Sequence, residues 1–190
     1  LISLIIFFLI FKPKVNLKKN FKVQIIRSTL MVTATTFMFY SLQKFDLVDI
    51  YVVFFTAPLI VSLLSAYFLK DILTPKGIAL MLLSFGSIIY SLGPSMRIFT
   101  PDLIFPIVPP ICWALYQFFT KVVSGDNDPF AAIFYTSILG AIIFSVFIFF
   151  NWVPLEKNIY WLYLTLLGVA GFVSHPLIIY AIQLSNLSFV

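Results

Sequence analysis

Long apolar segments separated by short polar loops run along almost the whole chain. Each of the six longest segments has the roughly 17–25 residues that a helix needs to cross the hydrocarbon core of a bilayer. Helix breakers and charged residues gather in the loops between them. The pattern predicts about seven membrane-spanning helices, over residues 1–11 (incomplete), 23–42, 48–69, 76–93, 102–122, 129–151 and 159–183, with a further one beginning at 186–190.

The composition supports the same class. Hydrophobic residues make up 62% of the sequence and charged residues 10%, whereas a soluble domain has about 25% charged residues. We therefore predict an all-α polytopic membrane protein, with the lipid bilayer as its surroundings. The net charge of +5 comes largely from lysines clustered in one loop. Such a cluster favours contact with an anionic membrane surface and argues against a nucleic-acid partner.

The distribution of positive charge predicts how the chain is oriented. Lysine and arginine are enriched in loops that stay on the cytoplasmic side. Counting alternate loops gives nine positive residues on one side and three on the other. The richer side, predicted to be cytoplasmic, has Lys12, Lys14, Lys18, Lys19, Lys22, Arg27, Lys70, Lys76 and Lys121, and the other side has Lys44, Arg97 and Lys157.

A short motif occurs twice in the sequence. Residues 40–47 read Tyr-Ser-Leu-Gln-Lys-Phe-Asp-Leu and residues 180–187 read Tyr-Ala-Ile-Gln-Leu-Ser-Asn-Leu, so that Tyr, Gln and Leu recur in register. The two copies belong to segments that enter the membrane from opposite sides. Two similar halves in inverted orientation are typical of secondary transporters, which bind substrate between the halves. We predict an inverted-repeat helical bundle, with repeats at 1–95 and 101–190.

Comparison of the halves also predicts that each repeat is truncated. The second half has an additional helix, at 102–122, before the part that corresponds to residues 1–11. The first half continues through two more helices beyond the point that corresponds to residue 190. By this comparison the first repeat lacks its N-terminal helix, the second lacks its last two, and the complete bundle has about ten helices.

The sequence contains few residues suited to catalysis. Every carboxylate lies in a loop or at the end of an apolar segment, so no paired-acid site is expected near the membrane centre. There is no cluster of cysteine and histidine and no phosphate-binding glycine loop, and the single cysteine, Cys112, excludes an internal disulfide. We predict no catalytic residue, no metal and no cofactor.

His175 is the ionisable residue that comes closest to the membrane interior. Pro176 follows it, which frees a backbone carbonyl and loosens the helix at that point. An imidazole there could bind substrate or carry a proton, because it titrates near neutral pH. The alternative is a neutral histidine that only hydrogen-bonds to a neighbouring helix or to the freed carbonyl.

Two helices each present a face of polar and aromatic residues. Spacings of three and four residues align Thr29, Thr33, Thr36, Tyr40 and Gln43 on one helix, and Trp113, Tyr116, Gln117 and Thr120 on another. These faces suit a cavity for planar or amphipathic solutes. The alternative is that the threonine hydroxyls bond to their own helix and that the aromatic rings only fill space.

Four further residues have structural interpretations. Pro58 lies within the segment 48–69 and predicts a kink or a gate, although packing alone also tolerates a proline there. Arg27, Lys70 and Lys121 lie at the predicted cytoplasmic edges. We interpret these three as anchors whose long side chains reach the membrane surface.

The order of several short motifs resembles the EamA-type drug/metabolite transporters over nearly the whole chain. In the first half the matching positions are Arg27, Phe39-Tyr40-Ser41-Leu42, Asp46-Leu47, Thr56-Ala57-Pro58-Leu59, Leu69-Lys70-Asp71, Gly77 and Gly86. In the second half they are Trp113-Ala114-Leu115-Tyr116-Gln117, Lys121, Phe134-Tyr135-Thr136, Gly140, Trp152, Gly168, Gly171, His175 and Tyr180-Ala181. The sequence departs from the family at Asp71, where glutamate is usual.

The resemblance implies a carrier that exchanges metabolites or drugs across a bacterial inner membrane, built from two inverted halves of about five helices each. On the matching positions, it implies a substrate cavity lined by Tyr40, Pro58, Trp113, Tyr116, Gln117 and His175. Since no buried carboxylate is present, we expect a neutral, zwitterionic or amphipathic small molecule as substrate. His175 is the candidate for proton coupling, and the oligomeric state stays open, a homodimer included.

Other functions remain as alternatives. A structural or assembly protein without transport would be silent in every flux assay. An intramembrane enzyme would need converging acids, a nucleophile with its base, or metal ligands within the spans. A channel would need a selectivity filter, for which the short loops offer no obvious material.

Overall fold

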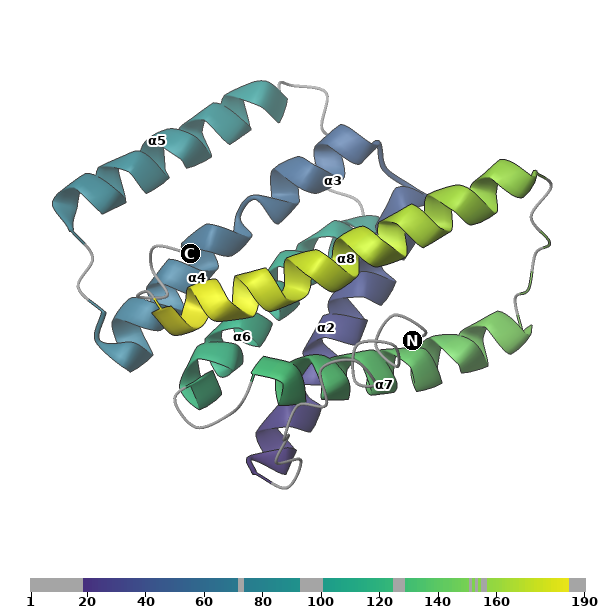
Figure 1. The fold of residues 1–190 in the computed structure, drawn as a ribbon. Helices are drawn as coiled ribbons and strands as arrows, with labels where there is room; N and C mark the ends of the chain where they lie inside the picture. The colour runs from purple at the N-terminus through teal and green to yellow at the C-terminus, as the bar shows by residue number, and fades with distance from the viewer. Residues whose placement is uncertain are drawn as a thin grey trace.

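The computed structural model describes residues 19–71, 74–92, 101–124, 129–150, 152, 154 and 157–184. All regular structure in these residues is helical, as predicted (Figure 1). The predicted incomplete helices at 1–11 and 186–190 lie outside the described residues. The elements are α2 (Phe21–Leu42), α3 (Leu47–Phe54), α4 (Ala57–Leu64), a π-helical turn (Ser65–Leu69), α5 (Pro75–Leu92), a 3-10 turn (Pro101–Leu103), α6 (Ile104–Ser124), α7 (Pro129–Phe150) and α8 (Asn158–Leu184).

Helices suited to crossing a membrane make up most of the described chain. Five are long and apolar enough, namely Phe21–Leu42, Leu47–Leu69, Pro101–Val123, Ala131–Phe150 and Asn158–Ile182. Many large apolar side chains on their outer faces are exposed, as suits contact with lipid. The all-α polytopic membrane class is therefore confirmed. The predicted count of about seven spans is not.

The segment from Leu47 to Leu69 is interrupted in the middle, as Pro58 predicts. α3 ends at Phe54 and α4 begins at Ala57, which makes Pro58 the second residue of α4. Proline lacks a backbone N–H. It is tolerated at this position because the N–H of any residue there would have no partner inside the helix. Both the backbone N–H and the hydroxyl of Thr56 donate to the carbonyl of Val53, over 3.0 and 2.7 Å. The structure thus has a break in the helix beside Pro58, while a kink or a gating role remains a prediction.

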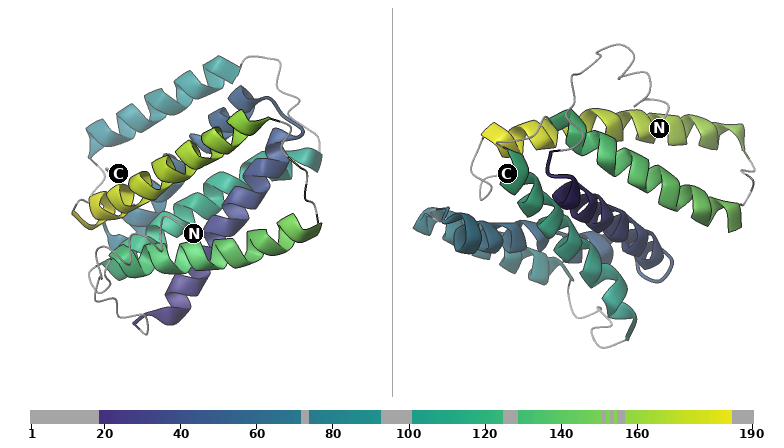
Figure 2. Two further views of the ribbon diagram at one scale, coloured as in Figure 1. Left: turned by 45° about the vertical axis from the view of Figure 1, so that its right-hand side comes forward. Right: turned by 90° about the horizontal axis from the view of Figure 1, so that it is seen from below.

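α2 and α6 form the centre of the bundle. α2 has its most extensive contacts with α6 and α7, and α3, α4 and α8 also pack on α6. α5 contacts α3 and lies at the edge of the bundle (Figures 1 and 2). We call the interface of α2 with α6 and α7 the seam, because it joins a helix of the first predicted repeat to two helices of the second.

Two polar contacts fix the relative directions of the helices. Lys44, just after α2, forms an ion pair with Asp102, just before α6, with 2.5 Å between Nζ and Oδ1. Lys121, near the end of α6, donates from Nζ to the carbonyl of Ile182 near the end of α8, over 2.8 Å. The ends of α2 and α8 therefore lie at opposite ends of α6. The repeated motif occupies these two helix ends, so its copies lie at opposite ends of the bundle.

One end of the bundle collects the predicted cytoplasmic segments. The starts of α2 and α7 and the ends of α6 and α8 meet there, since Arg27 near the start of α2 contacts Thr120 and Ala132. Lys19, Lys22 and Lys121 belong to these segments, and we call this the lysine-rich end. The grouping matches the alternation of loops from which the orientation was predicted.

Small and β-branched side chains form the best-buried contacts near this end. Ala132 and Ile133 of α7 pack on Ile179 of α8. Val61 of α4 and Ala114 of α6 pack on Ile182 of α8. Small side chains allow helices in a membrane to approach closely. These clusters hold α8 against the rest of the bundle and thereby position His175.

Candidate functional site

A fully buried arginine joins three helices at the seam. Arg27 of α2 has an exposed fraction of 0%. Its Nη1 donates to Thr120 Oγ1 of α6 over 3.1 Å. Its Nη2 donates to the carbonyl of Ala132 and to Thr136 Oγ1, both on α7, over 2.5 and 3.1 Å. These acceptors are all neutral, and no carboxylate in the described part of the chain forms an ion pair with Arg27. Among the residues that the structure describes, the seam thus contains a positive charge without a counterion.

A second buried polar side chain lies next to this arginine. Gln24 precedes Arg27 by three residues, so the two share one face of α2, and Gln24 is also 0% exposed. Both amide atoms of Gln24 and the Nε of Arg27 lack a hydrogen-bond partner among the described residues. A buried polar atom without a partner costs roughly 1–3 kcal/mol. Unpaired buried groups of this kind mark candidate functional sites.

A row of rings leads from Arg27 across α6 to α8. The guanidinium Cζ of Arg27 lies 4.9 Å from the centroid of the Tyr116 ring. Trp113 stacks on Tyr116, with 5.5 Å between ring centroids and 28° between ring planes. On its other sides Trp113 contacts His175 of α8 at 6.4 Å and Phe54 of α3 at 6.0 Å. We call Tyr116, Trp113 and His175 the aromatic row.

Three of the six residues predicted to line a substrate cavity form this row, namely Trp113, Tyr116 and His175. Gln117 follows Tyr116 on α6 and is half-buried. Pro58 is exposed at the start of α4. Tyr40 lies 13 residues after Arg27 on α2, which corresponds to about 20 Å along the helix axis. The described structure therefore gathers part of the predicted site and leaves Tyr40 near the opposite end of the seam.

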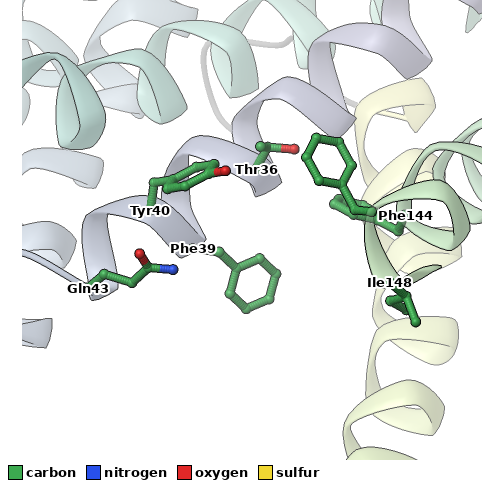
Figure 3. Close-up of a pocket in the computed structure, with 7 residues that line it drawn as sticks. Thr36, Phe39, Tyr40, Gln43, Phe144 and Ile148 are labelled. Carbon is green, nitrogen blue, oxygen red and sulfur yellow. The ribbon is translucent and has the colours of Figure 1, made fainter. Parts of the chain in front are cut away.

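Tyr40 borders a separate groove between α2 and α7, which Figure 3 shows. The groove has a volume of about 420 Å³ and is lined by Thr36, Phe39, Tyr40 and Gln43 of α2 and by Phe144, Phe147 and Ile148 of α7. One wall is therefore partly polar and the other is apolar. Three members of the predicted polar face border it, although the hydroxyl of Thr36 also donates to the carbonyl of Val32 over 2.8 Å.

The interpretation of Arg27 as a surface anchor is wrong. Its side chain is fully buried and hydrogen-bonds to α6 and α7, whereas a surface anchor would extend away from the bundle. Lys121 bonds to Ile182 and so ties α6 to α8, whereas Lys70 is exposed at the end of its helix. The available signal was the place of Arg27 within the span, on the same face as Gln24. An ionisable residue inside a span is a functional candidate by default.

The arrangement is suited to recognition of a solute. Within the described residues there is no group of three or more His, Cys, Asp or Glu side chains that could hold a metal ion. What the seam offers is a guanidinium, hydroxyl groups, an amide and flat aromatic faces. These groups bind planar, polar or anionic parts of small molecules.

A protein-family model matches most of the chain. The family model of the EamA-like transporter family matches residues 1–93 and 101–190. The chain belongs to the EamA-like transporter family. This confirms the resemblance drawn from the short motifs, and it identifies an integral, multi-pass membrane protein of the drug/metabolite transporter type. No match was found among curated proteins or among solved structures. Members of the EamA-like family are transporters and not enzymes, which implies a small-molecule substrate and a lipid environment.

Proposed function

We propose that this protein is a secondary-active carrier that moves a small neutral, zwitterionic or amphipathic metabolite or drug by alternating access. The observation that supports it is the seam, where α2 of the first family-matched region packs on α6 and α7 of the second. Carriers built from inverted repeats bind substrate at the interface between the repeats and expose it to each side in turn. The opposite placement of the two motif copies supports the same arrangement.

We assign the recognition of substrate to the aromatic row. The stacked rings of Trp113 and Tyr116 present flat faces, and Gln117 on the same helix can exchange hydrogen bonds with polar groups. Tyr40 would contact a solute in the groove between α2 and α7, on its way to or from the seam. Pro58 would act at the break between α3 and α4, where the helix can bend.

His175 is the proposed proton carrier if transport is driven by protons. It lies at the far end of the row, beside Trp113. His175→Gln keeps hydrogen-bonding atoms in a similar volume but cannot bind a proton near neutral pH. Uptake by this variant should no longer depend on pH, and an unchanged pH profile would remove His175 from this role.

We also propose a location and an orientation. The protein would lie in the inner membrane of a bacterium with its lysine-rich end in the cytoplasm, because that end carries most of the positive charge. Its groove between α2 and α7 would then face the outer side.

The experiment that tests the carrier is solute counterflow. Full-length protein is reconstituted into liposomes, and solutes that raise its thermal stability are tested for exchange across the bilayer. Trp113→Ala should lower exchange by about tenfold, equivalent to about 1.4 kcal/mol of lost binding. The matched control is Trp161→Ala, because Trp161 of α8 is 52% exposed and lies outside the row. Absence of exchange for every stabilising solute would contradict the proposal.

A further inference from the structure

The charge on Arg27 is the feature of the seam that the aromatic row does not explain. Burying a guanidinium away from water without a counterion costs free energy. The lipid around the bundle does not solvate the charge, so it does not lower this cost. Its three hydrogen-bond acceptors are two hydroxyls and one carbonyl. These bonds are already strengthened by the charge on the donor, and an anionic acceptor would add a direct attraction between opposite charges. An anion that reached Arg27 would therefore compete well for these N–H groups.

Gln24 indicates where such an anion would lie. Its amide and the Nε of Arg27 share one face of α2 and supply buried N–H donors that have no partner among the described residues. A carboxylate accepts two or more hydrogen bonds and suits such a set of donors. The remaining unpaired atom, Gln24 Oε1, is an acceptor and suits an ammonium or hydroxyl group on the same molecule.

The surroundings restrict the rest of the molecule. Arg27 covers the Tyr116 ring, on which Trp113 stacks in turn. A solute with its anionic group at Arg27 would therefore have its body beside flat aromatic faces. We propose that Gln24 and Arg27 bind the carboxylate of the transported solute, which narrows the substrate to a small carboxylate or zwitterion with an apolar or planar body. This inference rests on the carrier function proposed above.

The site is closed in this structure. Arg27 and Gln24 are both 0% exposed, and α2 is joined there to α6 and α7. In this proposal a solute reaches them when the seam separates at the lysine-rich end. Binding would then replace the contacts of Arg27 with Thr120 and Thr136 by contacts with the carboxylate. The solute would thus stabilise the open form of the end through which it enters.

The test compares carboxylates with their neutral amides. Three matched pairs of probes are phenylacetate and phenylacetamide, hexanoate and hexanamide, and phenylalanine and phenylalaninamide. The midpoint of thermal unfolding of the full-length protein is measured with each at equal ionic strength. Because a ligand stabilises a protein according to its affinity, the carboxylate of at least one pair should raise the midpoint by about 3 °C more than its amide. Sodium chloride and sodium acetate serve as controls, because their anions lack an apolar or planar body.

Two substitutions link this preference to the site. Arg27→Gln should abolish it, but this change also removes contacts at the seam and can impair folding. Gln24→Glu leaves Arg27 in place and supplies a resident carboxylate three residues away on the same face. It should therefore abolish the preference in a protein that still folds. Asn158→Asp adds the same charge at the exposed start of α8 and should leave the preference unchanged.

The outcomes separate this inference from the carrier function. If amides exchange in the counterflow assay as well as carboxylates and stabilise equally, the anion site is wrong while the carrier stands. If chloride or acetate alone gives the full stabilisation, the site binds an inorganic or minimal anion and the inference also fails. A carboxylate preference that survives Gln24→Glu would overturn the assignment to Gln24 and Arg27. If no probe or other solute exchanges at all, it is the carrier function that fails.

Discussion

The guanidinium of Arg27 lies over the ring of Tyr116, with 4.9 Å between Cζ and the ring centroid, where α2 packs on α6. The negative face of an aromatic ring attracts a cation, and the attraction reaches about 2 kcal/mol when both partners are removed from water. Together with the neutral hydrogen-bond acceptors, this ring explains how a buried charge is tolerated in the closed seam. The same ring begins the row that leads to His175, so the charge and the aromatic rings form a continuous series of contacts.

Replacing Tyr116 tests the contribution of the ring. Tyr116→Leu keeps an apolar side chain but removes the cation–π contact and the stacking on Trp113. We expect the free energy of unfolding, measured by denaturant titration in detergent, to fall by about 2–3 kcal/mol. Tyr116→Phe retains the ring and loses only the hydroxyl group, so it should cost about 0.5–1.5 kcal/mol. Equal losses for both variants would show that the ring does not stabilise Arg27.

Thr136 provides a test of the hydrogen bonds at the same arginine. Thr136 Oγ1 accepts from Arg27 Nη2 over 3.1 Å and donates to the carbonyl of Ala132 over 3.0 Å. Thr136→Val has the same shape but no hydroxyl, so it leaves one N–H of a buried charge without an acceptor. The expected loss of unfolding free energy is about 1.5–3 kcal/mol. Thr136→Ser restores the hydroxyl and should recover most of that loss; no recovery would mean that the packing of the methyl group matters and not the hydrogen bond.

Replacing Gln24 should raise the free energy of unfolding, whereas the replacements of Tyr116 and Thr136 should lower it. The amide of Gln24 is buried and unpaired in the described structure, so the closed, ligand-free protein bears the cost of its desolvation. Gln24→Leu has nearly the same volume and should raise the free energy of unfolding by about 1–3 kcal/mol. It should also weaken the binding of a carboxylate probe, because one donor of the site is lost. A variant that is less stable than the wild type would show that Gln24 has a partner essential to the fold.

Much of the fold follows from the sequence because lipid imposes simple rules. Apolar segments longer than about 17 residues become helices, and α2, α6, α7 and α8 begin and end within a few residues of the predicted bounds. Pro58 marks the break between α3 and α4 because proline has no backbone N–H and its ring clashes with the preceding helical turn. These features depend on local composition and backbone chemistry, which a single sequence records.

The candidate site follows from the sequence only in part. The spacing of Trp113 and Tyr116 on one helix correctly predicts that their rings lie together, since this is a local property. The contact with His175 depends on how α8 packs on α6, and the burial of Arg27 depends on how α7 approaches α2. Long-range packing of this kind leaves no periodic signal in the chain. The place of Arg27 inside its span marks a candidate, but the sequence does not show which helices bury the side chain.

The ion pair between Lys44 and Asp102 should contribute little to stability. Its side chains are 40% and 48% exposed, and exposed pairs typically contribute about 0.2–1 kcal/mol, less at high salt. In a double-mutant cycle with Lys44→Gln and Asp102→Asn, we expect a coupling energy below about 1 kcal/mol that falls as salt is added. A coupling of several kcal/mol that salt does not change would mean that this pair holds together the end of the bundle opposite the lysine-rich end.

The orientation of the two motif copies can be tested by chemical labelling. Cys112, the single cysteine of the chain, is first replaced by alanine, and one cysteine is then introduced at Lys22 or at Lys157. A thiol reagent that cannot cross the membrane is added to intact cells. If the lysine-rich end is cytoplasmic, Lys157→Cys reacts at once and Lys22→Cys reacts only after the membrane is made permeable.

This labelling also tests whether the two halves are inverted relative to each other. Lys22 is the second residue of α2 and Lys157 directly precedes α8, the two helices that carry the repeated motif. In an inverted repeat the starts of these two helices must lie on opposite sides of the membrane, and alternating access relies on that symmetry. Reaction of both cysteines from the same side would leave the two halves parallel. The seam between α2, α6 and α7 would then no longer be the boundary between inverted halves, and the argument for a substrate site there would lose its basis.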